Sequence, residues 1–159
     1  MNAKKEKDSP HVNFMPPAAL FISFGVGAVF EFIFRWNFEF PGLAARIIIG
    51  LIFAAGGFVF MMFGHEKFKK EKTAIKLNQP ARKLVMAGAY RYSRNPMYFG
   101  LSVMFIGIAV AAGSWSLLIA YLAWFSYLEF YAIPHEESYL KRAFGQEYEN
   151  YCKKVRRWI

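Results

Sequence analysis

The chain has 159 residues, of which 56% are hydrophobic and 19% aromatic, and its formal net charge at pH 7 is +9. This composition is too apolar for an ordinary soluble domain. The basic residues lie in blocks between apolar runs, which is typical of a membrane protein, and we expect no nucleic-acid partner. The single cysteine, Cys152, excludes an intrachain disulfide and a cysteine-rich metal site, and we expect no metal.

The apolar runs predict an all-α, polytopic membrane protein. Residues 1–16 are polar and are expected to form a cytoplasmic arm, whereas residues 17–159 form a single membrane domain. A helix of about 20 residues crosses the ~30 Å hydrocarbon core, so the runs predict four transmembrane helices. The last two are somewhat short and form a tight hairpin that enters at Pro96 and exits at Pro134. The predicted spans are residues 17–36, 43–63, 97–112 and 117–133.

Small residues in the second span predict close helix packing. Gly50 and Gly57 lie there among several alanines, and such residues let helix backbones approach each other in lipid. Only the short link 37–42 joins the first two spans, so we expect these two spans to lie antiparallel and adjacent. Gly25 and Gly27 of the first span are then the expected partners of the second span's glycines.

The distribution of positive charge predicts the orientation of the chain. Of the 20 Lys and Arg residues, 18 lie in the N-terminal arm, in residues 64–95 or in the tail after Pro134. The positive-inside rule places these regions in the cytoplasm, so both termini are expected on the cytoplasmic side of a cell (inner) membrane. The other two, Arg35 and Arg46, flank the link that is predicted to lie outside.

Two acids fall inside the predicted spans. Glu31 lies four residues before Arg35 near a helix end, where the two side chains can reach the interface and each other. An acid in a spanning helix is also a functional candidate, which leaves open a coupling site in a small exporter. For Glu129, near the inner end of the fourth span, a structural partner and a substrate contact are equally open.

The tail after Pro134 is basic and amphipathic. Its large apolar residues recur at helical spacing, which predicts one or two cytoplasmic amphipathic helices that lie on the membrane or under the bundle. Gly145 is the expected point of division. The apolar face consists of Leu140, Phe144, Tyr148, Tyr151 and Val155.

The predicted topology brings segment 88–100 and this tail together at the inner interface. Arg94 can hold a carboxylate or a phosphate with its planar guanidinium. Three tyrosines of the segment can offer ring faces to a cation, and Glu136 and Glu137 can offer carboxylates to an amine. The same residue types are common interface anchors, so a ligand site and a structural role both remain open.

Two longer motifs carry a family resemblance. The first is Gly88-x-Tyr90-x-x-x-Arg94-Asn95-Pro96-x-Tyr98-x-Gly100. The second, beyond the hairpin, is Glu136-Glu137-x-x-Leu140-x-x-x-Phe144-Gly145-x-x-Tyr148-x-x-Tyr151-x-x-x-Val155. Together they resemble the isoprenylcysteine carboxyl methyltransferase and phospholipid methyltransferase family, over residues 82–158. Members of that family are integral membrane enzymes that use S-adenosylmethionine without a Rossmann domain.

The resemblance implies that segments 82–98 and 134–155 hold the cofactor, with Glu136 on the ammonium of its methionine moiety and tyrosines beside its sulfonium. The candidate catalytic residues are Arg94, which can tie the loop to the tail or hold a carboxylate, and Glu137, which can serve structure or the substrate or take the proton of an amine acceptor. Many members have histidine in place of Asn95, and the prenylcysteine enzymes carry a substrate-binding arginine in place of Ala132. The implied cofactor contacts are Arg82, Lys83, Leu84, Val85, Tyr90, Asn95, Pro96, Met97, Tyr98 and Glu136.

The implied function is methyl transfer from S-adenosylmethionine to a lipophilic or amphiphilic acceptor, through a carboxylate, an amine or a thiol. The expected partners are the lipid bilayer and a lipid, prenylated or other lipophilic acceptor. Two other functions remain as alternatives: a small four-helix exporter with Glu31 as its coupling site, and a non-enzymatic adaptor that binds lipid through its basic loops. The sequence leaves the acceptor and the oligomeric state open.

Overall fold

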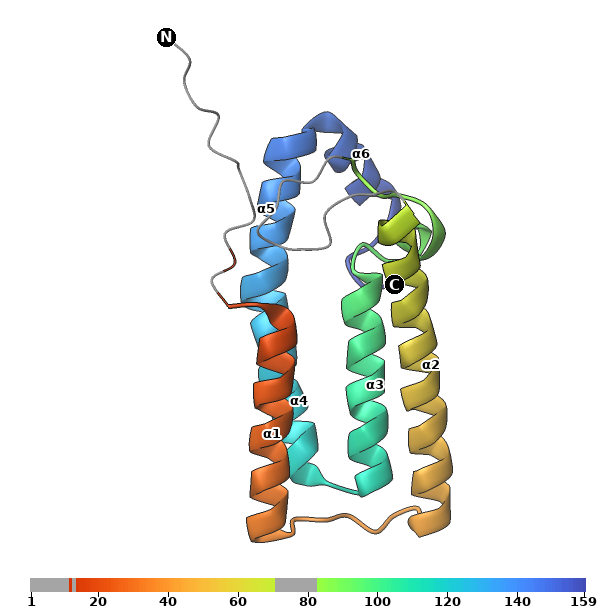
Figure 1. Ribbon diagram of the computed structural model, residues 1–159, viewed down its shortest axis with the longest axis vertical. Coiled ribbons are helices and arrows are strands. Elements are labelled where there is room, and N and C mark those ends of the chain that lie inside the picture. The colour runs from red at the N-terminus through yellow and green to blue at the C-terminus, as the bar shows by residue number, and fades with distance from the viewer. Residues whose placement is uncertain (1–11, 13, 71–82) are drawn as a thin grey trace.

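The structure is a computed structural model that describes residues 12, 14–70 and 83–159 (Figure 1). Over these residues it is all-α, as predicted, apart from one isolated β-bridge between Asn37 and Ser114. The helices are α1 (Pro16–Phe34), α2 (Leu43–Lys70), η1 (Gly88–Arg91), α3 (Pro96–Ala112), α4 (Trp115–Tyr127), η2 (Leu128–Ala132), α5 (Ile133–Phe144) and α6 (Gln146–Lys154). Of these, η1 is a 3-10 helix and η2 is a π-helix.

Three of the described helices are long and apolar enough to cross a membrane. They are Pro16–Phe34, Leu43–Glu66 and Trp115–Phe144, the last of which contains α4, η2 and α5 in one continuous helix. The helix α3 is also apolar but has only 17 residues, which rise by about 25 Å, somewhat less than the ~30 Å core. A fourth crossing by α3 therefore stays a prediction.

The helix that contains the fourth predicted span extends beyond Pro134. The helix continues into α5, and the turn just before the proline is the π-helix η2, in which the backbone N–H of Ile133 donates to the carbonyl of Leu128. A proline in an α-helix lacks one donor, and its ring clashes with the carbonyl four residues earlier. The wider π-turn relieves this conflict, so the helix carries Glu136 and Glu137 onward without a break.

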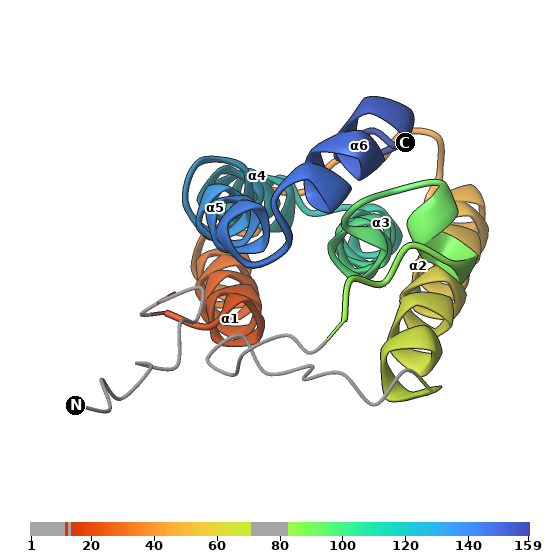
Figure 2. The same ribbon diagram turned by 90° about the horizontal axis from the view of Figure 1, so that it is seen from above.

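The long helices pack as two antiparallel pairs, α1 with α4 and α2 with α3 (Figures 1 and 2). Glycines set the second contact. A Cβ atom added at Gly50 would lie 2.5 Å from the carbonyl oxygen of Gly107, and one at Gly57 would lie 2.5 Å from that of Gly100. The helix α3 therefore supplies the partners of these glycines, and the prediction that α1 supplies them is wrong.

The link between α1 and α2 explains this difference. It runs across one end of the bundle beside the α3–α4 turn, where Phe38 N donates to Gly113 O (2.7 Å) and Trp115 N donates to Trp36 O (3.0 Å). The two helices that it joins thus lie in different pairs. Gly27 packs against Ala120 of α4, while a Cβ atom at Gly25 would meet nothing within 4 Å.

The same end of the bundle holds Glu31. Its Oε2 accepts a hydrogen bond from Ser114 Oγ at 2.5 Å, and Ser114 Oγ in turn accepts one from Leu117 N at 3.1 Å. Ser114 is thereby the N-cap of α4 and also ties that helix to α1. Glu31 has a structural contact across the first helix pair.

A core of aliphatic and aromatic side chains joins the two pairs. Phe105 of α3 and Trp124 of α4 are 2% and 0% exposed, and their ring centroids lie 6.2 Å apart. Leu20 of α1 and Leu128 belong to the same cluster. Because α3 contacts both α2 and α4, the start of α3 is held in a fixed position relative to α5.

The tail forms two helices, as predicted, and Gly145 divides them with a φ of +52°. Its predicted apolar face packs together and also covers Leu84. The tail, η1 and the C-terminus all lie at the end of the bundle opposite the α1–α2 link (Figure 1). Both family motifs therefore converge at one end.

Candidate active site

The site begins with Tyr98 and Glu136, one from each motif. Asn95 and Pro96 start α3, which places Tyr98 in its first turn, and Pro134 lies in the first turn of α5, which places Glu136 just beyond it. Tyr98 Oη donates to Glu136 Oε1 at 2.5 Å across 38 positions of sequence. An acid and a tyrosine ring thus face the same space between α3 and α5.

The loop before α3 is tied to the C-terminal segment. Ser93 Oγ donates to the carbonyl oxygen of Arg157 (3.3 Å) and accepts from Asn95 N (3.0 Å). The side-chain amide of Asn95 donates to the same carbonyl at 3.2 Å, and Arg94 N donates to Arg156 O at 3.0 Å. The Asn95 side chain, an implied cofactor contact, is therefore engaged with the protein's own backbone.

Two arginines hold Glu137. Arg157 binds it with a fork, Nη2 to Oε2 at 2.7 Å and Nε to Oε1 at 3.2 Å, and Arg94 Nη2 lies 3.2 Å from Oε1. Arg157 Nη1 also donates to Glu129 Oε1, and Trp158 Nε1 donates to Glu129 Oε2 at 3.0 Å. Glu129 therefore has structural partners, one of the two roles left open for it. The hydrogen bonds to Glu137, and next those to Glu129, raise the pKa of Arg157.

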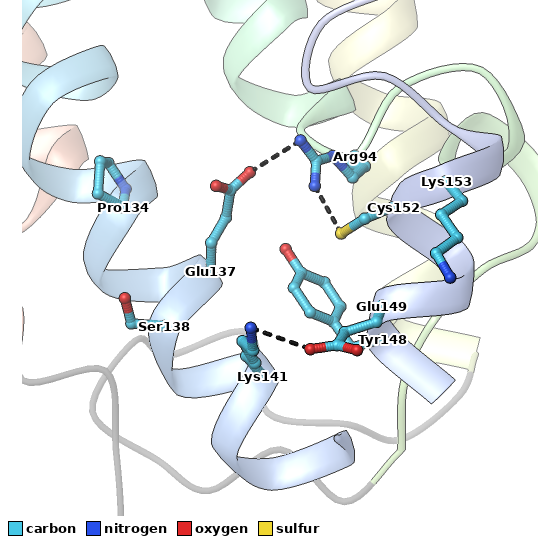
Figure 3. Close-up of a pocket in the computed structure, with 9 residues that line it drawn as sticks. All are labelled: Arg94, Pro134, Glu137, Ser138, Lys141, Tyr148, Glu149, Cys152 and Lys153. Carbon is cyan, nitrogen blue, oxygen red and sulfur yellow. Dashed lines mark hydrogen bonds and ion pairs between the residues drawn. The ribbon is translucent and has the colours of Figure 1, made fainter. Parts of the chain in front are cut away.

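A pocket of about 510 Å³ opens beside Glu137, between α5 and α6 (Figure 3). In it Arg94 Nη1 donates to Cys152 Sγ at 2.6 Å, and Lys141 pairs with Glu149 at 2.9 Å. Its volume suits a small-molecule ligand. Of the predicted site residues that the structure describes, Arg94 and Glu137 line it. The full lining is Arg94, Pro134, Glu137, Ser138, Lys141, Tyr148, Glu149, Cys152 and Lys153.

Tyr90 lies buried behind this region. Its carbonyl oxygen accepts a hydrogen bond from Tyr151 Oη at 2.7 Å, which ties η1 to α6. Burial raises the pKa of both hydroxyls, so each stays neutral near pH 7. Tyr90 is also close enough to Glu136 for the carboxylate charge to raise its pKa further.

The remaining residues that are implied to contact the cofactor differ in their exposure. Leu84 and Val85 are each 7% exposed, Pro96 is fully buried, and Met97 is half-buried beside Gly64. Lys83 is exposed, and Arg82 lies outside the described residues. Of the apolar members of this set, Leu84, Val85 and Pro96 are therefore buried, and Leu84 packs against the tail.

Sequence reasoning missed three contributors: Arg157, Trp158 and Cys152. Arg157 belongs to a run of basic residues that is typical of cytoplasmic tails, and only the fold-back of the chain distinguishes it from its neighbour Arg156. Trp158 stacks on Phe125 with ring centroids 5.2 Å apart, a contact that no sequence spacing indicates.

Comparisons with known proteins give the family. The model of the phospholipid methyltransferase family matches residues 45–147 of this chain. Protein-S-isoprenylcysteine O-methyltransferase B of Arabidopsis thaliana is 36% identical over 75 residues, which are 46% of this chain and 37% of that protein. Protein-S-isoprenylcysteine O-methyltransferase of Schizosaccharomyces pombe is 36% identical over 74 residues, 45% of this chain and 30% of that protein. An uncharacterized protein of Haemophilus influenzae is 35% identical over 63 residues, its whole length.

The match covers little more than a third of the plant enzyme and less of the yeast enzyme. The family description, however, covers more than half of this chain. The chain therefore belongs to the phospholipid methyltransferase family, whose members are membrane methyltransferases that use S-adenosylmethionine. This confirms the resemblance that the two motifs indicated.

Proposed function

We propose that this member of the phospholipid methyltransferase family transfers a methyl group from S-adenosylmethionine to a lipophilic acceptor that arrives from the bilayer. The observation that carries the proposal is the hydrogen bond between Tyr98 and Glu136. It joins the two motifs at the bundle end where the tail, η1 and the C-terminus converge. The comparisons support methyl transfer as the reaction class, whereas the lipophilic acceptor is part of the proposal.

The residues at this end fit the cofactor's chemistry. Glu136 offers a carboxylate to the ammonium of the methionine moiety, and the neutral rings of Tyr98 and Tyr90 suit a neighbouring cation. Leu84, which packs against the tail, and the buried Val85 next to it in sequence would give the nucleoside an apolar surface. The bound cofactor supplies an electrophilic methyl group on a sulfonium.

Arg94 and Glu137 act in this proposal by holding the site together. Glu137 accepts hydrogen bonds from Arg157 and lies in an ion pair with Arg94. Arg94 links the loop before α3 to α5, so it fixes the separation of the two motifs.

Transfer in line needs alignment and exclusion of water more than acid or base residues. The acceptor's lone pair forms the new bond to the methyl carbon as the sulfur–carbon bond breaks and leaves a neutral thioether. A carboxylate or thiolate acceptor needs no base, whereas an amine must also lose one proton. Ala132, fully buried, stands where prenylcysteine enzymes carry their arginine, which favours an acceptor other than a prenylcysteine carboxylate.

We also propose the orientation that brings cofactor and acceptor together. Four helices, α3 included, cross the cell membrane, and both termini lie in the cytoplasm. Residues 17–159 form one domain that binds both the cofactor and the acceptor. The support is the gathering of 18 of the 20 Lys and Arg residues in regions outside the predicted spans and the outer link. The cofactor then enters from the cytoplasm and the acceptor from the bilayer.

The test is calorimetry on purified protein in lipid nanodiscs with S-adenosylmethionine. We expect Glu136→Ala and Tyr98→Ala each to weaken binding by about tenfold or more, because each removes a contact to a charged group. Glu147→Ala, an exposed acid of α6 that does not line the pocket, is the matched control and should leave the affinity unchanged. Wild-type affinity in both site variants would refute the assignment of these residues.

A second experiment identifies the acceptor. Membranes that contain the protein are incubated with methyl-labelled S-adenosylmethionine, and the labelled lipid, peptide or small molecule is isolated. Label that appears with wild-type protein and is lost with Glu136→Ala supports the proposed reaction. Binding of the cofactor without any labelled product in the native membrane would contradict the transfer step.

A further inference from the structure

The last five residues, 155–159, follow α6 and fold back toward the helical bundle. They lie beyond residues 45–147, which the family description matches. This segment passes between the loop before α3 and the continuous helix formed by α4, η2 and α5. Its central residue, Arg157, contacts both of these parts at once, and its side chain is 29% exposed.

The guanidinium of Arg157 acts on the helical side. It holds Glu137 in a fork and donates its remaining nitrogen to Glu129, so it lies between two carboxylates that are 21% and 26% exposed. Two partly buried carboxylates on the same side of a helix repel each other unless a cation lies between them. Arg157 therefore offsets the repulsion between two acids of one continuous helix.

The backbone of Arg157 acts on the loop side. Its carbonyl oxygen accepts from Ser93 Oγ and from the amide of Asn95, and Asn95 is the residue that starts α3. Tyr98 follows in the first turn of that helix, and Glu136 precedes Glu137 in α5. The two sides of Arg157 thus hold Asn95, three positions before Tyr98, and Glu137, the neighbour of Glu136, and Tyr98 and Glu136 are joined by their own hydrogen bond.

We propose that Arg157 is a positioning residue for methyl transfer, which sets the separation of Tyr98 and Glu136 by joining the start of α3 to the start of α5. This inference rests on the proposed function, since it concerns the same site. Trp158 supports the arrangement by donating to Glu129 and stacking on Phe125, which anchors the segment on the helix that it must hold.

The test compares Arg157→Ala, Arg157→Lys and the control Lys154→Ala, which removes one exposed positive charge from the same tail. For each variant, the Kd for S-adenosylhomocysteine is measured in nanodiscs together with the Tm. We expect Arg157→Ala to raise the Kd by about tenfold or more, because the loop and α5 lose their common anchor, and to lower the Tm, because two partly buried carboxylates lose their cation. The Kd of Arg157→Lys should lie between those of the wild type and Arg157→Ala, since an ammonium cannot form the fork. Lys154→Ala should match the wild type.

A double variant separates positioning from general destabilisation. Adding Glu137→Gln to Arg157→Ala removes the repulsion between the two acids, so part of the lost affinity should return. If Arg157→Ala fails to fold, Arg157→Lys and the double variant decide. If Arg157→Lys and the double variant lost affinity only in proportion to their loss of Tm, Arg157 would have a merely structural role and the inference would be overturned.

The two proposals fail differently. Wild-type protein that does not bind S-adenosylhomocysteine at all would refute the proposed cofactor site and the role of Arg157 with it. Wild-type binding that Arg157→Ala changes no more than Lys154→Ala does would refute only the role of Arg157. Loss of affinity in Arg157→Ala with partial return in the double variant supports both.

Discussion

The two ends of the helical bundle contain the same kind of contact in different surroundings. At one end Glu31 accepts a hydrogen bond from the hydroxyl of Ser114, and at the other Glu136 accepts one from the hydroxyl of Tyr98, both at 2.5 Å. Each bond joins helices from different parts of the sequence. By residue type alone, the two acids would be equal candidates for function.

What surrounds each acid separates them. Around Glu31 the further contacts are backbone hydrogen bonds of the α1–α2 link and the α3–α4 turn, and Ser114 is occupied as a helix cap. Around Glu136 lie a second acid, Glu137, and the two arginines that bind it, with a pocket next to them. An acid in an apolar helix therefore indicates chemistry where further polar groups converge, which favours methyl transfer over an exporter coupled through Glu31.

The largest expected effect comes from the close contact between α2 and α3, which run the length of the bundle. In Gly57→Val the new side chain would collide with the backbone of Gly100 and force α2 away from α3, so we expect a loss of stability of about 3 kcal/mol or more. Thermal unfolding in detergent measures it. Gly56→Val is the matched control, because a Cβ atom there would meet nothing within 4 Å. Equal Tm values for the two variants would contradict the observed packing.

A pair of variants tests the contrast between the two acids directly. Glu136→Ala should raise the Kd for S-adenosylmethionine by about tenfold or more, whereas Glu31→Ala should leave it unchanged and lower the Tm. The physical reason is that Glu31 joins α1 to α4, far from the motifs. Calorimetry and thermal unfolding on the same preparations measure both quantities. A fall in cofactor affinity in Glu31→Ala would remove the distinction.

Ser114→Ala should destabilise the protein by about 1 to 2 kcal/mol, because it removes the cap on Leu117 N and the hydrogen bond to Glu31 together. The measurement is the shift in thermal unfolding. Ser126→Ala, an exposed serine of the same helix, serves as the control. A stability loss no greater than that of the control would show that the outer contact is not structural.

A smaller effect is expected from Tyr98→Phe. This change removes one hydrogen bond but keeps the ring beside the proposed sulfonium position, so the affinity for S-adenosylmethionine should fall by about fivefold, or about 1 kcal/mol. Comparing this variant with Tyr98→Ala separates the hydroxyl from the ring. If both variants weakened binding equally, the ring would have no part in binding.

The smallest effect is expected from Lys141→Ala at the pocket between α5 and α6. The ion pair of Lys141 with Glu149 is exposed, at 66% and 40% of the side chains, and should contribute nothing measurable to cofactor affinity or Tm. Calorimetry decides. A clear loss of affinity would move the proposed cofactor position from the Tyr98–Glu136 side of Glu137 to the pocket side.

The sequence predicted the parts of this fold that depend on local patterns. The all-α class, the start of α3 at Pro96 and the apolar face of the tail with its break at Gly145 follow from hydrophobic spacing and from residues with special backbone preferences. The motif residues Tyr98 and Glu136 were also singled out. Their direct contact follows once α3 starts at the end of the bundle where the continuous helix from α4 carries Glu136.

The features that the sequence did not predict depend on contacts between distant segments. A short link normally joins adjacent helices, and nothing in residues 37–42 shows that this one runs across the bundle. Glycines indicate close approach without naming the partner, so α3 could not be chosen over α1. Arg157 has the same residue type as Arg156 beside it, and only the return of the chain to Ser93 and Asn95 sets it apart.

The π-turn before Pro134 has a further consequence for the angular phase of the helix. In an unbroken α-helix the seventh residue onward from Glu129 returns to within about 20° of it, and the eighth lies about 80° away. The seventh is Glu136 and the eighth is Glu137. Because η2 adds one residue to a turn, Glu137 takes the aligned position and meets Glu129 at Arg157, which turns Glu136 toward Tyr98. Straightening η2 into a regular α-helix without a deletion would exchange the directions of these neighbouring acids, whereas deleting one residue of the π-turn would keep them.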